Sequence, residues 1–295
     1  MLGALESRSV KPILLDTATL ESTTYAFEDD MLRLEPDHGE SLEIKLGIPT
    51  RGWVRRLSPP RWRRGTEAGT EQAAVRSAWS ALLSAIASAA KVSWLTPLEH
   101  LFLRENKLVQ AAAANRLGIQ TPKTVVVSDR SQIPVALGQE FVVKPLGSSS
   151  YSGSEGVEQV VWSQLVSRDS VLLDLLPAAP FILQARLKTK RHLRVVTVSG
   201  QAWACELAAD GLPLDWRRDE AAHDSFLPTS EPAVERKALQ LAATLELGYS
   251  SQDWITTENG AFFIDLNPAG QWMFLPQEVS SAITEAIATW LNKQG

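Results

Sequence analysis

The sequence contains a single cysteine, Cys205, among its 295 residues. One cysteine cannot form a disulfide within the chain, so a reducing compartment is its simpler environment. No run of about 18 uninterrupted apolar residues occurs, which excludes a transmembrane helix. The first residues carry Glu6 and are interrupted by Pro12, a pattern unlike that of a signal peptide. We therefore expect a cytoplasmic protein that has no membrane partner.

An excess of positive charge is also missing. The chain has 29 Lys and Arg against 34 Asp and Glu, a formal net charge of −5. Proteins that bind nucleic acid normally have a basic surplus, so we expect no nucleic-acid partner. Tyr and Met are scarce, at 3 each, whereas 10 Trp are present. The hydrophobic fraction of 44% is ample for a sizeable core.

Short extended patterns predominate in residues 1–60. They occur at Pro12–Leu15, Met31–Leu34 and Leu42–Leu46, separated by acidic and Pro- or Gly-containing turns. This arrangement predicts a small β-rich lobe. A helical pattern begins at Glu71, with apolar residues spaced by three and four positions.

Strands and helices alternate after Gly118, a suitable left-handed helix cap. A hairpin is expected near Ser199-Gly200 and another at the turn Glu258-Asn259-Gly260. The pattern as a whole predicts a mixed α+β fold in two or three lobes. We expect helices at 71–89, 97–117, 232–248 and 276–293, and strands at 124–128, 141–144, 181–187, 193–200, 201–209, 253–256 and 261–266.

The most basic stretch of the chain is GWVRRLSPPRWRRG, residues 52–65. One interpretation is a solvated loop, which is common for clustered arginines. The other is a docking surface for an acidic partner, because guanidinium groups pair well with carboxylates. Arg55 and Arg56 would carry that contact.

Three oxygen-bearing side chains stand near the C-terminus: Asp253, Asp265 and Asn267. The turn between the two expected strands brings Asp253 near the other two, and residues 265 and 267 share a strand face. Two carboxylates and an amide oxygen suit Mg²⁺. Ordinary turn-forming use of Asp and Asn is the alternative.

Lys144 ends an apolar strand and precedes a loop rich in Gly and Ser, including Ser148, Ser149 and Ser150. A lysine at this point can neutralise a phosphate, while the loop donates hydrogen bonds. Neither GxxxxGK nor GxGxxG is present, so the loop is not one of those nucleotide motifs. A flexible linker is the alternative reading.

Together, these motifs resemble the ATP-grasp superfamily, whose members hold ATP between two α+β lobes. The resemblance covers about residues 95–295. It implies a short N-terminal pre-ATP-grasp lobe at 1–95, a central lobe at 96–180 and a C-terminal lobe with the metal site at 181–295. The motifs are Glu105-Asn106-Lys107, LGIQTPKTVVVSD (117–129), FVVKP (141–145), FILQ (181–184), LRVVTVSG (193–200) and DWITTENGAFFIDLNPAGQW (253–272).

Within the superfamily the chain looks most similar to the graspetide maturases of the microviridin type. Shared features are WVRR (53–56), KLVQ (107–110), Asp215-Trp216-Arg217 and NPAGQW (267–272). The resemblance implies that ATP phosphorylates an Asp or Glu side chain of a ribosomal precursor peptide, which has a leader and a core. Ser, Thr or Lys of the same peptide then closes an ester or amide ring. A homodimer is expected by resemblance only.

The resemblance also implies roles for individual residues, with ATP and Mg²⁺ as cofactors. Asp265 and His192 depart from the family pattern, which usually has Glu and an acidic residue there, and Ala185 replaces an acidic residue. Two alternatives stay open: a ligase that does not macrocyclise, and a degenerate peptide-binding module. The expected roles are Asp253, Asp265 and Asn267 for Mg²⁺; Lys107, Lys144 and Ser148, Ser149 and Ser150 for the phosphates; backbone groups of Gln184, Ala185, Arg186 and Leu187 for the adenine hinge; Arg194 and Arg217 for catalysis; and Arg55, Arg56, Trp216 and Gln271 for the peptide, with Trp53, Trp62 and Trp272 beside its channel.

Overall fold

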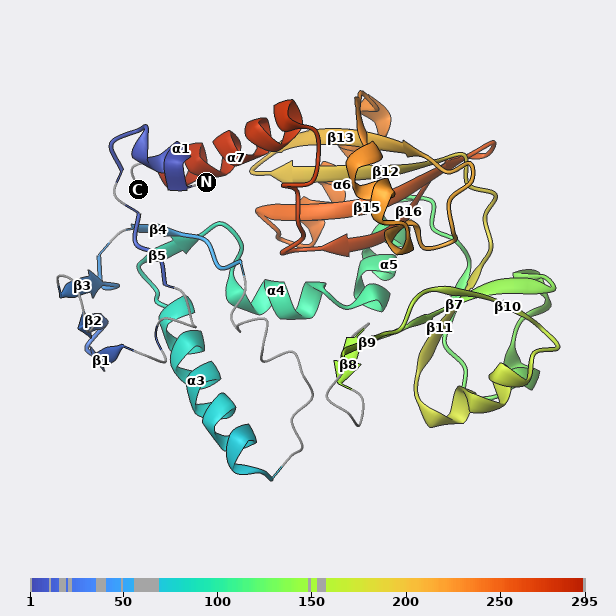
Figure 1. The fold of residues 1–295 in the computed structure, drawn as a ribbon, viewed down its shortest axis with the longest axis horizontal. Coiled ribbons are helices and arrows are strands. Elements are labelled where there is room, and N and C mark those ends of the chain that lie inside the picture. The colour runs from blue at the N-terminus through green and yellow to red at the C-terminus, as the bar shows by residue number, and fades with distance from the viewer. Residues whose placement is uncertain are drawn as a thin grey trace. The chain divides into compact units, whose positions relative to one another are not determined.

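A computed structural model describes residues 2–10, 12–15, 20, 23–35, 41–48, 50–55, 69–147, 150–152 and 158–293, with the backbone alone at 150–152 and 158. The chain forms two compact units, Met1–Leu101 with Thr284–Gly295, and Phe102–Ile283 (Figure 1). The expected three-lobe division at 95/96 and 180/181 stays a prediction. Arg56, Trp62, Ser148 and Ser149 lie outside the described residues, as does the side chain of Ser150.

The first unit contains a small antiparallel sheet and a long helix. The helix α3 begins after Thr70, whose hydroxyl accepts a hydrogen bond from the Ala73 amide. Leu83 and Ile86 of α3 pack with Leu32 and Ile44 of the sheet. The elements are α1 (Leu2–Glu6), β1 (Thr24–Glu28), β2 (Met31–Glu35), β3 (Leu42–Lys45), β4 (Thr50–Gly52), α3 (Glu71–Ala87) and β5 (Val92–Trp94), with β4 and β5 parallel.

Two details of this unit differ from the sequence prediction. Pro12–Leu15 forms no strand, whereas β1, which was not predicted, pairs along its whole length with β2. The tight turn between these strands uses Asp29 and Asp30, both at positive φ. Asp tolerates that conformation because its short polar side chain bonds locally, so the acidic turn joins two strands.

The helix expected at 97–117 is two helices, α4 (Leu98–Arg104) and α5 (Lys107–Arg116). Asn106 breaks the run, because its side-chain oxygen accepts hydrogen bonds from the amides of Leu108 and Val109 at 2.9 and 3.3 Å. An Asn in this position caps a new helix rather than continuing the old one. The expected stop at Gly118 is confirmed by its φ of +66°.

The second unit begins with a four-stranded antiparallel sheet in the order β10-β7-β11-β6. Phe141 and Leu183 are fully buried in its core, which lies on one face of the sheet. The strand expected at 124–128 is shorter than predicted. The elements are β6 (Thr124–Val125), η2 (Arg130–Gln132), η3 (Val135–Leu137), β7 (Glu140–Pro145), β10 (Gln164–Ser167), η4 (Val171–Ala178) and β11 (Phe181–Ala185), with a separate hairpin of β8 (Ser150–Ser152) and β9 (Glu158–Val160).

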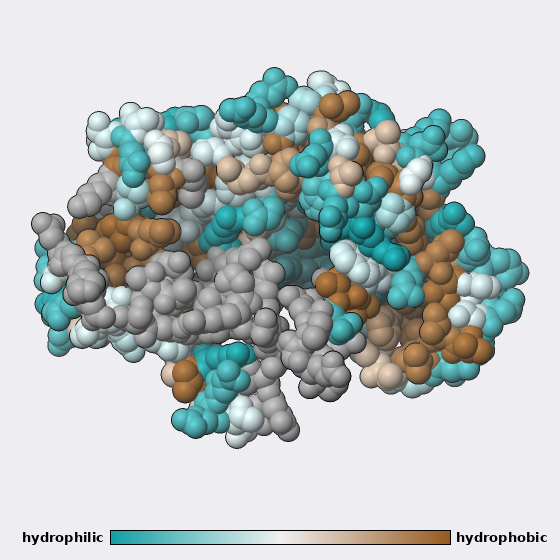
Figure 2. Space-filling model, viewed as in Figure 1, coloured by the Kyte–Doolittle hydropathy of each residue, from teal (hydrophilic) through white to brown (hydrophobic). Residues whose placement is uncertain are grey.

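The short 3-10 helix η4 covers that core with only some of its apolar residues. Leu173 and Leu176 are buried, whereas Leu172 and Leu175 are 51% and 60% exposed. Figure 2 shows hydrophobic residues gathered on the surface of this right-hand part of the chain. The exposed leucines therefore provide sites where truncation should cost little stability.

A five-stranded antiparallel sheet in the order β14-β13-β12-β15-β16 forms the rest of this unit. Both predicted hairpins are confirmed. Ser199 and Gly200 have φ of 44° and 87°, the pair of positive values that a two-residue turn between twisted strands requires. The strands are β12 (Arg191–Val198), β13 (Gln201–Ala208), β14 (Leu227–Thr229), β15 (Tyr249–Thr257) and β16 (Gly260–Asn267).

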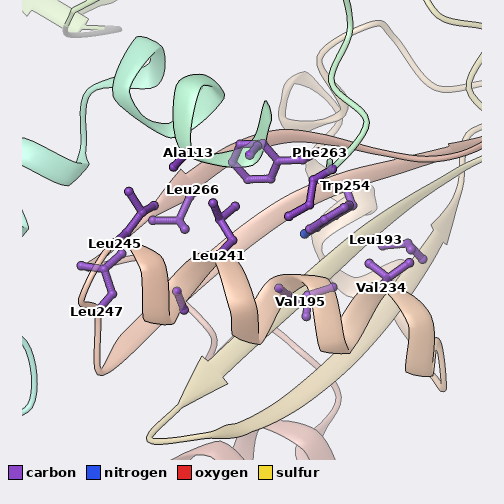
Figure 3. Packing of buried hydrophobic residues seen from close by; sticks show 14 of the residues in the cluster. Ala113, Leu193, Val195, Val234, Leu241, Leu245, Leu247, Trp254, Phe263 and Leu266 are labelled. Carbon is purple, nitrogen blue, oxygen red and sulfur yellow. The ribbon is translucent and has the colours of Figure 1, made fainter. Parts of the chain in front are cut away.

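Helix α6 packs across this sheet and supplies much of a hydrophobic core of this unit (Figure 3). Leu241 and Leu245 of α6 meet Trp254 and Phe263 of β15 and β16, and Ala113 of α5 joins the same cluster. Cys205 is fully buried on β13, as expected for a small apolar residue, and burial raises its thiol pKa to about 11. The remaining elements are η5 (Trp216–Arg218), η6 (Glu220–Ser225), α6 (Pro232–Thr244) and α7 (Gln277–Leu291).

No helix among the described residues is both long and apolar enough to cross a bilayer.

Leu241→Ala should lower the free energy of unfolding by about 3 kcal/mol, because Leu241 is fully buried and its loss leaves a cavity. Leu175→Ala makes the same chemical change at an exposed site and should cost less than about 0.5 kcal/mol. Urea unfolding of the full chain measures both. Equal losses in the two variants would contradict the assigned core.

Candidate active site

A cleft in the second unit lies between the four-stranded and five-stranded sheets, with residues from α5, β7, β11, β12, η5, β15 and β16 in its walls. Arg186, Arg194, Asn267 and Gln271 are not among its lining residues, and Arg55 belongs to the first unit. The predicted site residues that line the cleft are Lys107, Lys144, Gln184, Ala185, Leu187, Trp216, Arg217, Asp253 and Asp265.

Strand alternation on β7 gives the cleft an apolar part and a charged part. Phe141 and Val143 face the core of the four-stranded sheet, so Val142 and Lys144 face the cleft. Val142 lies opposite Gln184 near the end of β11, and Lys144 lies roughly 7 Å further along its strand. Leu187 and Ile264 add to the apolar lining. A flat apolar group and an attached anion would therefore fit side by side.

The predicted hinge at the end of β11 is built from backbone. The Ala185 amide donates to the Lys123 carbonyl at 2.9 Å, and the Gln184 side chain donates to the Thr124 hydroxyl at 2.9 Å. Arg186 turns away to pair with Glu140 at 2.8 Å. The Arg186 side chain therefore does not contribute to the cleft. A hinge that acts through its main chain does not need this side chain, and that hinge role stays a prediction.

Lys144 is the most buried cation of the cleft, with 8% of the residue exposed. Burial lowers the pKa of its amine, while the carboxylates of Asp265 and Asp253 act in the opposite direction and Lys107 and Arg217 add to the lowering. A cation in this position gains from any further negative charge that enters the cleft. An anionic ligand would therefore be bound there more tightly than at a surface lysine.

A β-bulge places Asp265 in the cleft. Asp253 pairs with Asp265 across β15 and β16, but Trp254 pairs with Phe263, so Ile264 has no partner. Phe263 is in the core, and simple alternation would send Asp265 there too. The extra residue reverses the facing, so that Asp265 joins Asp253 in the cleft.

Each of these carboxylates has a cation beside it. Arg194 Nη1 lies 3.2 Å from Asp253 Oδ1, and Lys107 Nζ lies 3.8 Å from Asp265 Oδ2. Both carboxylates are partly exposed, at 27% and 29%. Oxygen ligands with open space suit Mg²⁺, which commonly uses one or two carboxylates and completes its shell with phosphate and water.

Asn267 lies two residues beyond Asp265 and opposite Ser251. Its side-chain oxygen accepts from the Ala269 amide at 2.8 Å, which leaves a second lone pair for another partner. The donor set thus fits a hard cation through two carboxylates and an amide. No group of three or more His, Cys, Asp or Glu side chains suited to a metal occurs in the described part of the chain.

The loop after Asn267 is held closely against β15. The Tyr249 hydroxyl donates to the Gly270 carbonyl at 2.8 Å, and a Cβ on Gly270 would come within 2.6 Å of the Ser251 Cβ. Only glycine fits such an approach. Gln271, expected to meet the peptide, is exposed in this loop and does not line the cleft.

Arg217 forms a two-point ion pair with Asp215. Its Nε and Nη2 donate to the two carboxylate oxygens, each at 2.8 Å. The Asp215 hydrogen bond is the largest cause that raises the pKa of Arg217, with the carboxylates of Asp253 and Asp265 adding to it. The buried Asp215 orients the guanidinium, so Arg217 presents its charge at the cleft wall.

Arg194 stands behind the carboxylates, with 11% of its side chain exposed. Its Nη1 also donates to the Ser251 hydroxyl at 3.0 Å. The guanidinium lies 5.8 and 5.6 Å from the ring centres of Trp216 and Phe274. The Arg194 guanidinium therefore holds Asp253 through an ion pair, while the rings of Trp216 and Phe274 lie close to the same guanidinium.

Tryptophans near the cleft are mostly structural. Trp216 is 6% exposed, lines the cleft and packs edge-on against His223 and Phe226. Trp272 is 2% exposed and packs on Tyr249, so the expectation that it borders a peptide channel is wrong. The Trp272 indole packs inside the fold and is not accessible to a peptide.

Basic residues cluster at 186–194, and such a run by its charge alone predicts contact with an anionic partner, but most of them pair within the chain. Arg186 binds Glu140, Lys190 lies 3.5 Å from Glu258, and Arg191 binds both Glu206 and Glu231. The carboxylates come from strands β7 and β13, from the turn after β15 and from the residue before α6, so the fold decides these pairs and local sequence does not. Of the arginines in the run, Arg194 pairs with a residue of the cleft, Asp253.

Three residues of this region were named from the sequence, within a motif or as a departure from the family pattern, but were given no role in the site. Asp215, His192 and Gln110 orient or line the site, yet each looks ordinary alone. His192 lines the cleft, and burial lowers its pKa against the opposing effect of Asp253 and Asp215. Gln110 could have been found from its place one turn after Lys107, whereas no local spacing rule marks Asp215.

Comparison with known proteins rests on structure, because no family model and no curated protein sequence matches the chain. A Chryseobacterium gregarium RiPP-associated ATP-grasp ligase, in complex with ADP and a leader and core peptide, matches with a TM-score of 0.84. Identity is 21%, over 98% of this chain and 90% of the other. The chain has the ATP-grasp fold.

Other ATP-grasp and macrocyclase structures agree. Macrocyclase MdnC from Microcystis aeruginosa MRC, bound with precursor peptide MdnA, matches with a TM-score of 0.81 and 19% identity over 98% of this chain and 93% of that one. ATP-grasp ligase PsnB, with a phosphomimetic variant of its minimal precursor, Mg and ADP, gives 0.71 and 15% over 99% and 93%. The fold expected from the motifs is confirmed.

Lys144→Met should raise the free energy of unfolding by about 1 kcal/mol, because an apolar side chain of similar length avoids the cost of burying a charge, which is the largest effect on the Lys144 amine. The wild-type stability should also rise with pH between the lowered folded-state pKa of Lys144 and the ordinary value of 10.5, since the unfolded chain holds more protons there. That rise should be absent from the variant. Urea unfolding across this pH range measures both.

The surface variant Lys190→Met serves as a control, because the Lys190 side chain is 56% exposed. It should keep the wild-type pH dependence. A variant at 144 that is less stable than wild type, with the pH slope unchanged, would show that the amine is not desolvated in the free protein.

Proposed function

We propose that this chain is an ATP- and Mg²⁺-dependent ligase that joins side chains of a ribosomal precursor peptide into macrocycles. The observation that carries the proposal is the cleft of the ATP-grasp fold, where Lys107, Lys144 and Arg217 face Asp253 and Asp265. Such a mixture of cations and carboxylates suits phosphoryl transfer, which depends on positioning and charge neutralisation. The neighbours bound to ADP and precursor peptides support the same reaction class.

ATP would lie along β7. Its base fits the apolar lining of Val142, Leu187 and Ile264 beside the hinge, and its phosphates reach Lys144 and Lys107. Ser148, Ser149 and Ser150 would close over the phosphates from the loop that follows β7. Burial of Lys144 strengthens its attraction for the phosphates, because fewer waters compete.

Asp253, Asp265 and Asn267 would hold Mg²⁺. When bound, the ion would neutralise phosphate charge during transfer. Arg194 keeps Asp253 in place through its 3.2 Å ion pair, and the Lys107 amine lies 3.8 Å from Asp265. The residues of this chain therefore set the positions of the carboxylates before any ion binds.

The reaction has two balanced steps. An Asp or Glu carboxylate of the peptide attacks the γ-phosphorus, the bond to the β-phosphate oxygen breaks, and ADP leaves. A Ser or Thr hydroxyl or a Lys amine then attacks the acyl carbon, phosphate leaves with the bonding electrons, and the nucleophile's proton passes to water. Arg217, held by Asp215, would stabilise the transferred phosphoryl group, and Arg194 would support the acyl phosphate.

Peptide recognition is the less defined part of the proposal. Arg55 is half-buried after β4, and with Arg56 it would bind an acidic segment of the leader. Trp216 and Gln271 would meet the core peptide, Trp216 through the small part of its ring that reaches the cleft. The expected homodimer stays a prediction.

Incubation with Mg²⁺, ATP and a synthetic peptide containing repeated Thr and Glu should release ADP and lower the peptide's intact mass by one water for each ring. Mass spectrometry and a coupled ADP assay measure the two quantities. The precursor encoded beside this gene, where one exists, is the best peptide to test first.

Two outcomes would overturn the proposal in favour of the alternatives. ADP release with a mass gain in the presence of a free amino acid would indicate a ligase that does not macrocyclise. Tight peptide binding without ADP release above background would indicate a binding module that has lost catalysis.

Asp265→Asn should reduce ADP release by more than about 100-fold at unchanged fold, because it removes one charged ligand without changing shape. Asp174→Asn makes the same change in an exposed ion pair with Arg130 outside the cleft and should keep full turnover. Steady-state ADP release with circular dichroism as the folding check compares them. Undiminished turnover of the Asp265→Asn variant would refute the assignment of Asp265 as a metal ligand.

A further inference from the structure

Gln110 is a buried amide that touches the strand carrying the proposed metal ligands. Only 1% of the residue is exposed. Its Nε2 donates to the Leu266 carbonyl at 2.7 Å, and its Oε1 accepts from the Leu266 amide at 3.0 Å. The side-chain amide thus bonds both backbone groups of Leu266, as a neighbouring strand would.

The third hydrogen bond of Gln110 reaches another element. Nε2 donates its second hydrogen to the Arg104 carbonyl, also at 2.7 Å. That carbonyl stands at the end of α4, where helices leave acceptors unpaired. Gln110 therefore joins the end of α4, the middle of α5 and the outer edge of β16.

The residues on either side of these contacts are those of the proposed reaction. Asp265 and Asn267 flank Leu266, and Lys107 lies three residues before Gln110, within one turn of α5. The Leu266 amide that Gln110 accepts from also donates to Asp265 Oδ1 at 3.0 Å. The Leu266 amide thus connects the Asp265 carboxylate with the helix that carries Lys107.

The hydrogen bonds of Gln110 are needed to keep Lys107 and Asp265 at a fixed distance. Their 3.8 Å contact joins two partly exposed side chains, a kind of pair that by itself holds little. The two Gln110 bonds to Leu266 are buried, and there a lost partner leaves unpaired groups and costs far more. The buried clamp, and not the ion pair, sets the distance.

We propose that Gln110 is a positioning residue that holds Lys107 and the Asp265–Asn267 segment at the separation needed for Mg²⁺ and phosphate together. The inference rests on the proposed function for its ligands, whereas the clamp itself is a property of the free protein. Gln110 acts through Leu266 and touches no reacting atom.

Gln110→Met keeps the length of the side chain and removes all three hydrogen bonds. In the free variant, amide hydrogen exchange should become faster in the peptides that cover 107–116 and 260–267, because β16 loses its edge partner. The Mg²⁺ concentration for half-maximal ADP release should rise about tenfold, as for other residues that orient metal ligands. Excess Mg²⁺ should restore much of the rate.

Thr197→Val is the matched control. It also removes a buried hydrogen bond from this unit, that between the hydroxyls of Thr197 and Ser250 at 2.7 Å, without touching α5 or β16. It should lose stability in urea, as Gln110→Met does, but keep the wild-type Mg²⁺ dependence and the exchange rates at 260–267. A purely structural role would give the two variants the same Mg²⁺ response.

The outcomes separate the two proposals. Wild-type protein that neither releases ADP nor binds Mg²⁺ and ADP in calorimetry would refute the proposed function, and exchange at 260–267 would still test the clamp. Wild-type activity together with unaltered exchange and Mg²⁺ dependence in Gln110→Met would refute the role of Gln110.

Discussion

The site depends on two like charges that face each other on neighbouring strands. Asp253 and Asp265 are cross-strand partners, an arrangement that is unfavourable unless opposite charges stand close by. Arg194 and Lys107 supply those charges, and the buried Lys144 adds a third. The cleft therefore holds nearly balanced charges. A cation that enters can take over the carboxylates from the arginine and lysines, and a polyanion that enters can then bind the cations so released.

Much of this site was predictable because its residues occur in short, ordered motifs. Lys144 at the end of a strand, and the spacing of Asp253, Asp265 and Asn267, follow from strand alternation and one turn. The bulge at Ile264 was not predictable, since an extra residue in a strand leaves no local signature. Without the bulge Asp265 would face the core, so the predicted closeness of Asp253 and Asp265 depends on a feature that the sequence pattern does not show.

Errors came where local pattern leaves more than one outcome open, or where the partners lie far apart in sequence. The break in the helix at 97–117 depended on whether Asn106 would cap or continue, a choice that local pattern leaves open. Arg186 and Arg191 seemed available to a ligand until strand pairing supplied their carboxylates. Gln110 contacts Leu266 across 156 positions of the sequence, so no local pattern predicts this hydrogen bond.

The five-stranded sheet ends in strands that are closed to further pairing. On β16, the amide of Phe263 donates to the Gln120 carbonyl, and both backbone groups of Leu266 bind Gln110. At the opposite end, β14 carries Pro228, which has no amide hydrogen to offer. An open edge invites strands from other molecules. The same glutamine that bonds Leu266 thus also occupies part of the outer edge of β16, where another molecule's strand would otherwise find free backbone groups.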